Sequence, residues 1–135
     1  MRGLLADINA QGQVRLLQRI CESETWREIW SYLNLPVHTL QELGLPDNAS
    51  DAIIWRECQR RQLVLITANR NADAPDALEA IIRQENTFQS LPVITLADEE
   101  RLRQEPSYAL RAVEKLLDIL FAIDDYRGAG RLFVP

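Results

Sequence analysis

The sequence has no long apolar run, and acids outnumber its bases. None of its apolar runs approaches the roughly 18 residues that a membrane-spanning helix needs, and its first residues lack the long apolar centre of a signal peptide. We therefore expect a soluble, cytoplasmic protein that does not bind membranes. The formal net charge of −5 argues against a broad, non-specific nucleic-acid surface, although it leaves room for a local one.

Histidine and cysteine are also scarce. The two cysteines, Cys21 and Cys58, lie far apart in helical patterns, which argues against a disulfide scaffold or a thiolate metal site and predicts two buried free thiols. The only histidine, His38, has no serine or cysteine nucleophile motif near it. We expect a strand-surface or hydrogen-bonded histidine rather than a general base.

Apolar patterns typical of strands and of helices follow one another along the chain. The length of 135 residues and the 47% hydrophobic content fit a single domain over 1–135. Strands are predicted at 3–8, 37–40, 63–66 and 92–96, and helices at 11–21, 24–33, 51–61, from 75 onward and at 108–123. This order predicts an α/β fold of three layers, with a central, mostly parallel four-stranded sheet flanked by helices. The tail, 126–135, is expected to form an edge strand or to exchange onto a partner.

The stretch 50–73 contains the candidate site. Its buried strand is followed by Thr67, Asn69, Asn71 and Asp73. The carboxyl edge of a parallel sheet is where such folds place ligands and catalytic groups.

Two further acids are expected at this same edge of the sheet. Asp7 ends the first predicted strand, and Asp51 opens the helix at 51–61. Converging oxygen ligands suit a hard cation such as Mg²⁺ or Mn²⁺, which can activate a water and hold a phosphodiester. A simpler interpretation is helix capping, by Asp7 or Asn9 for the first helix and by Asp73 or Asp76 for the next. Ser50 can cap the central helix, and Asp51 in its first turn would then point back into the helix start.

Three sequence motifs resemble the PIN-like domains, especially small, uncharacterised bacterial members related to toxin–antitoxin systems. They are L-L-A-D-I-N near the start, L-G-L-P-D-N-A-S-D before the central helix, and L-V-L-I-T followed by A-N-R-N. The resemblance covers about residues 2–97, and leaves a helix and tail in 98–135. It implies a PIN-like fold and an Mg²⁺- or Mn²⁺-dependent ribonuclease that cleaves single-stranded RNA, with Asp7 and Asp51 as acidic ligands. It also implies an antitoxin or another protein as a partner.

The third motif departs from the family pattern. The family commonly has Thr-x-Asp-x-Asp-Phe, whereas this chain has Thr67, Asn69, Asn71 and Ala72. Each exchange of aspartate for asparagine removes a negative charge, so metal affinity should fall unless Asp73 compensates. Two hypotheses follow. The chain is either a metal-dependent ribonuclease with Asp7, Asp51, Asn69 and Asn71 in its site, or a catalytically inactive module that binds RNA or a protein.

Two apolar features predict a homodimer. Trp26 and Trp30 lie on one helical stripe, and the tail ends in Leu132, Phe133 and Val134.

Overall fold

The structure is a computed structural model that describes residues 1–68 and 77–135. A five-stranded sheet forms its centre, in the order β2-β1-β3-β4-β5, and every pair of neighbouring strands is parallel. The strands are β1 (Gly3–Ala6), β2 (Val37–His38), β3 (Leu63–Ala68), β4 (Val93–Leu96) and β5 (Arg131–Val134). The helices are α1 (Gln11–Cys21), α2 (Arg27–Leu33), α3 (Asp51–Arg61), α4 (Ala77–Glu85), α5 (Glu99–Gln104) and α6 (Pro106–Phe121), with 3-10 helices η1 (Ile8–Ala10) and η2 (Ile123–Tyr126).

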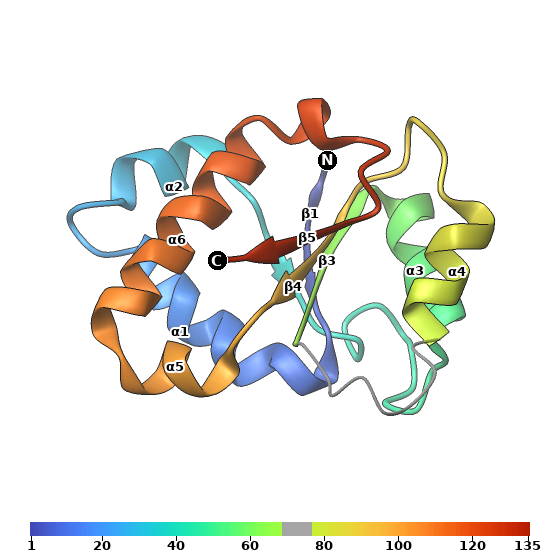
Figure 1. Cartoon of the computed structure of the whole chain (residues 1–135), viewed down its shortest axis with the longest axis horizontal. Helices are drawn as coiled ribbons and strands as arrows, with labels where there is room; N and C mark the ends of the chain where they lie inside the picture. The colour runs from blue at the N-terminus through green and yellow to red at the C-terminus, as the bar shows by residue number, and fades with distance from the viewer. Residues whose placement is uncertain (69–76) are drawn as a thin grey trace.

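Helices cover both faces of this sheet, which confirms the expected α/β architecture. One layer contains α1, α2, α5 and α6, and the opposite layer contains α3 and α4 (Figure 1). All residues of β1, β3 and β4 are buried, as expected for strands that are covered on both sides.

The predicted count of four strands is wrong, because the tail supplies a fifth. Gly128 and Gly130 both have positive φ, and they turn the chain from η2 into β5. β5 then pairs with β4, and its last residue, Val134, is buried in the core. Of the two expectations for the tail, the edge strand is therefore confirmed.

The chain leaves β1 and β3 in opposite directions across the sheet, toward β2 and toward β4. The connection after β1 passes through α1 on one face, whereas the connection after β3 leads to α4 on the other (Figure 1). Two neighbouring strands whose connections leave in opposite directions form a topological switch point, and a crevice opens there at their carboxyl ends. The fold thus singles out the ends of β1 and β3 as a place for a ligand.

Local signals account for α3 and β3. The Ser50 hydroxyl accepts a hydrogen bond from the Ile53 N–H and caps α3, while Gln62 ends the helix in the left-handed conformation. The chain then enters β3 directly. A short connection of this kind places the amino end of α3 at the same edge of the sheet as the carboxyl ends of the strands (Figure 1).

Several predicted boundaries need correction. The first strand ends at Ala6 rather than residue 8, because Asp7 already caps η1. The second helix begins at Arg27, with Trp26 as its N-cap, and the second strand contains only Val37 and His38. Asp98 caps α5, so the acids at 98–100 open a helix as expected.

Both features that suggested a dimer pack within the chain. Trp26 and Trp30 are half-buried against the same core as α6, and β5 pairs with β4 of its own chain. Cys21 and Cys58 are buried free thiols, as predicted. The homodimer stays a prediction. Within residues 1–68 and 77–135, no helix combines the length and apolar character that crossing a membrane requires.

Candidate active site

Three polar side chains form a row across the carboxyl ends of the central strands. Asp7 follows β1, Thr67 lies in β3 and Thr95 lies in β4, and the strand register places them beside one another. The residue two positions before each of these three packs against α3 and α4. These residues are Leu5, Leu65 and Val93. Because side chains alternate along a strand, the row faces this same layer. All three members are buried, with exposed fractions of 6%, 4% and 1%.

Asp7 is held by two neutral donors. Its Oδ1 accepts a hydrogen bond from the Ile8 N–H at 2.8 Å, and its Oδ2 accepts one from the Thr67 hydroxyl at 3.0 Å. Asp7 therefore caps η1, whereas the predicted helix, α1, has Ala10 as its N-cap and no side-chain cap. The contact with Thr67 goes further, because it ties the ends of β1 and β3 together at the switch point.

The negative charge of Asp7 has no positive partner within the described residues. No lysine, arginine or histidine there lies within ion-pair distance of its carboxylate. Burying a carboxylate without a counter-charge is costly, even when neutral groups donate hydrogen bonds to it. The charge of Asp7 also affects the pKa of a buried thiol. Burial, together with the charges of Asp7 and Glu57, raises the pKa of the Cys58 thiol to about 12.

Asn9 does not cap α1 as one interpretation predicted, and instead contacts the end of β3. Its Oδ1 lies 3.3 Å from the Thr67 hydroxyl and 3.4 Å from the Ala68 backbone nitrogen. A neutral carbonyl oxygen therefore lies beside the carboxylate of Asp7. The signal in the sequence was weak, since an asparagine two residues after a strand is equally typical of a turn.

Thr95 is the second residue missed. Its hydroxyl is buried and has no hydrogen-bond partner in the described structure. The pairing of Thr67 with Thr95 places the two threonines side by side. Only the strand register reveals this proximity, because the two residues are far apart in the chain.

Asp51 opens α3 at the same edge of the sheet. It is half-buried, and Ser50 rather than Asp51 is the N-cap of the helix. This confirms the predicted cap by Ser50, with Asp51 in the first turn of the helix. Asp51 also has an interaction of its own within the structure.

The remaining predicted site residues, Asn69, Asn71 and Asp73, lie outside the described residues. Among the residues that are described, no group of three or more histidine, cysteine, aspartate or glutamate side chains could hold a metal ion. His38 is half-buried in β2, and its Nδ1 lies 3.4 Å from a carboxylate oxygen of Glu42. It is thus a half-buried strand histidine that lies beside a carboxylate.

The donor types fit a hard cation. Asp7 offers a carboxylate, and Asn9 and Thr67 offer neutral oxygens, which are the ligand types that Mg²⁺ and Mn²⁺ prefer. One carboxylate with neutral oxygens makes a weak site, because charge supplies much of the affinity.

The chain was compared with protein families, curated proteins and solved structures, and no relative was found. No family model matches the chain, and neither the curated proteins nor the solved structures include a significant match.

Proposed function

We propose that this chain is a PIN-like, metal-dependent ribonuclease that cleaves single-stranded RNA at the switch point between β1 and β3. One observation carries the proposal: Asp7 is a buried carboxylate at that point, and only neutral donors contact it within the described residues. A bound divalent cation would supply the missing positive charge. We assign Asp7 as a direct ligand of Mg²⁺ or Mn²⁺, with Asp51, Asn69, Asn71 and Asp73 as the further ligands that the sequence predicts.

The residues of the chain have distinct tasks in this mechanism. The Ile8 N–H and the Thr67 hydroxyl fix both oxygens of Asp7, so the carboxylate does not have to reorganise when it binds a ligand. Asn9 adds a carbonyl oxygen that carries no net charge. The metal, when bound, would polarise a phosphodiester and lower the pKa of a bound water. The helices on both faces of the sheet hold these groups at one edge.

A second function is favoured by the same hydrogen bonds. Both oxygens of Asp7 already accept bonds from within the chain, so its carboxylate is partly satisfied without a ligand. This arrangement fits a catalytically inactive module that binds RNA or a protein such as an antitoxin. The two functions make opposite predictions about cleavage.

The test is a cleavage assay with labelled single-stranded RNA and Mn²⁺. We compare the wild type with Asp7→Asn and with the control Asp98→Asn. Both aspartates cap a helix after a parallel strand, and asparagine retains that ability, but Asp98 lies at the end of β4, two strands from β1.

We expect Asp7→Asn to slow cleavage by about 100-fold or more, since it removes the buried charge from the metal site. Asp98→Asn should cleave as the wild type does, and EDTA should abolish all cleavage. No cleavage by the wild type would favour the inactive module. Equal cleavage by Asp7→Asn would contradict the assigned site.

A further inference from the structure

The first helix carries arginines but no acid. Arg15 and Arg19 are the only charged residues of α1, whereas each of α2 to α6 includes at least one acid. In a chain with a net charge of −5, α1 is therefore a local concentration of positive charge. The sequence had left room for such a local basic surface.

These two arginines are also not engaged within the chain. Neither Arg15 nor Arg19 has a hydrogen bond or an ion pair in the described structure. Several other arginines, in contrast, form ion pairs with acids: Arg56 with Glu85, Arg60 and Arg61 with Glu57, and Arg127 with Asp124. Arg15 and Arg19 therefore keep their full charge and their donors for an external group.

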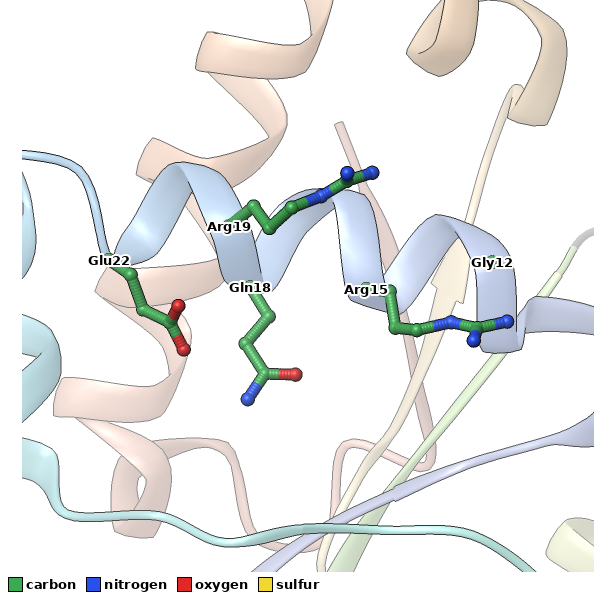
Figure 2. A pocket seen from close by; sticks show the side chains of 5 residues that line it. All are labelled: Gly12, Arg15, Gln18, Arg19 and Glu22. Carbon is green, nitrogen blue, oxygen red and sulfur yellow. The ribbon is translucent and has the colours of Figure 1, made fainter.

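An open hollow of about 560 Å³ lies along this helix. Its lining contains no apolar side chain and consists of Gly12, Arg15, Gln18, Arg19 and Glu22. Figure 2 shows both arginine side chains extending along α1 toward its amino end, while Gln18 and Glu22 point to one side. A methyl group added at Gly12 would meet nothing within 4 Å, so the surface there is open.

The amino end of this hollow lies near the candidate site. Only η1 and Gln11 separate Gly12 from Asp7 along the chain, and α1 starts at the carboxyl edge of the sheet (Figure 1). A polymer bound along α1 would therefore lead toward the switch point. At the opposite end of the hollow, Glu22 supplies a negative charge that repels an anion.

Phosphate is the ligand group that fits this surface. The planar guanidinium of arginine forms paired hydrogen bonds to phosphate oxygens, and residues four apart on a helix are neighbours on its surface. An acidic protein would meet the same charges, but the centre of a protein interface is rich in aromatic and other apolar side chains, and none of these lines the hollow.

We infer that the hollow on α1 binds the phosphodiester backbone of single-stranded RNA through Arg15 and Arg19, and directs the strand toward Asp7. The inference rests on the proposed function for its choice of RNA. Gly12 provides room for the strand between the arginines and the sheet edge, and Glu22 limits the basic surface at the other end.

The test measures binding of a fluorescein-labelled uridine oligonucleotide by anisotropy, in EDTA so that no metal-dependent cleavage occurs. The double variant Arg15→Gln/Arg19→Gln is compared with Arg60→Gln/Arg83→Gln, which removes the same charge from α3 and α4 in the opposite layer. We expect the α1 variant to bind about tenfold more weakly and to lose about 1.4 from the slope of log affinity against log salt. The control should change little, and Glu22→Gln should bind more tightly.

Three results would overturn the inference: no saturable binding by the wild type at low salt, equal weakening by both double variants, or wild-type affinity in the α1 variant. Binding of polyglutamate in place of RNA, lost in the α1 variant, would assign the hollow to an acidic protein instead. Cleavage separates this inference from the proposed function. RNA binding that depends on α1 without any cleavage would leave the inference standing and refute the nuclease, whereas cleavage with unchanged binding would do the reverse.

Discussion

Asp7 places a negative charge inside the protein at the switch point. The Thr67 hydroxyl donates to its Oδ2, while the neighbouring Thr95 hydroxyl has no partner among the described residues. The two threonines are paired in register and equally enclosed, and they differ mainly in what their hydroxyls contact. They therefore form a matched pair for measuring how strongly the structure depends on the contact with Asp7.

We predict that Thr67→Val destabilises the fold by about 1–3 kcal/mol, because it removes a donor from a buried carboxylate. Thr95→Val should be neutral or stabilising by up to about 1 kcal/mol, since it replaces an unpartnered buried hydroxyl with a methyl group of similar shape. Urea unfolding of both variants measures the difference. A greater loss in Thr95→Val than in Thr67→Val would contradict the hydrogen bonding described here.

Residue identity in the sequence predicted only part of this site. It indicated Asp7 at the mouth of a strand, and the structure adds that Asp7, Thr67 and Thr95 form one row. The row depends on which strands are neighbours and on their register, and both are set by packing of the whole sheet. A local pattern contains neither.

At the scale of elements, apolar periodicity predicted the order of four strands and of the helices between them, although several bounds differ by two or three residues. The predicted helices at 11–21 and 51–61 match α1 and α3. The strand count failed at the tail, because four residues with only one buried side chain give a weak strand signal. β5 is identified by its pairing with β4 and by the glycine turn before it.

That turn leads to a prediction about Gly128. Its φ is +85°, and a methyl group added there would lie 3.2 Å from the backbone Cα of Phe88. We expect Gly128→Ala to destabilise the protein by about 1–2 kcal/mol or more, because L-residues are strained in this region and the backbone neighbour cannot move aside easily. Thermal unfolding provides the measurement.

Gly12→Ala is the matched control for this substitution. Gly12 lies within α1 with open space around it, so alanine should stabilise the helix by about 0.5–1 kcal/mol. A stabilising effect of Gly128→Ala would show that the tail does not adopt the turn into β5.

At the scale of the whole molecule, the sheet order explains why a site lies where it does. β1 and β3 are neighbours whose connections leave on opposite faces, and the amino ends of α1 and α3 meet the same edge (Figure 1). The sequence predicted this parallel architecture from the alternation of strands and helices. It did not predict the strand order, which depends on how the helices divide between the two faces.

The charge distribution follows the same division. The arginines of α3 form ion pairs, whereas those of α1 have none within the described residues. An acidic protein can in this way combine a low overall affinity for nucleic acid with one local surface for a phosphate backbone. Net charge alone would have excluded only a broad surface.

The proposed nuclease site requires Asp7 as a ligand for a divalent cation, and calorimetric titration of Mn²⁺ tests this most directly. We predict saturable binding to the wild type and to Asp98→Asn, with a dissociation constant on the order of millimolar, since the described donors include one carboxylate and neutral oxygens. Asp7→Asn should show no saturable binding. Absence of saturable binding to the wild type, or equal binding to Asp7→Asn, would contradict the metal site at the switch point.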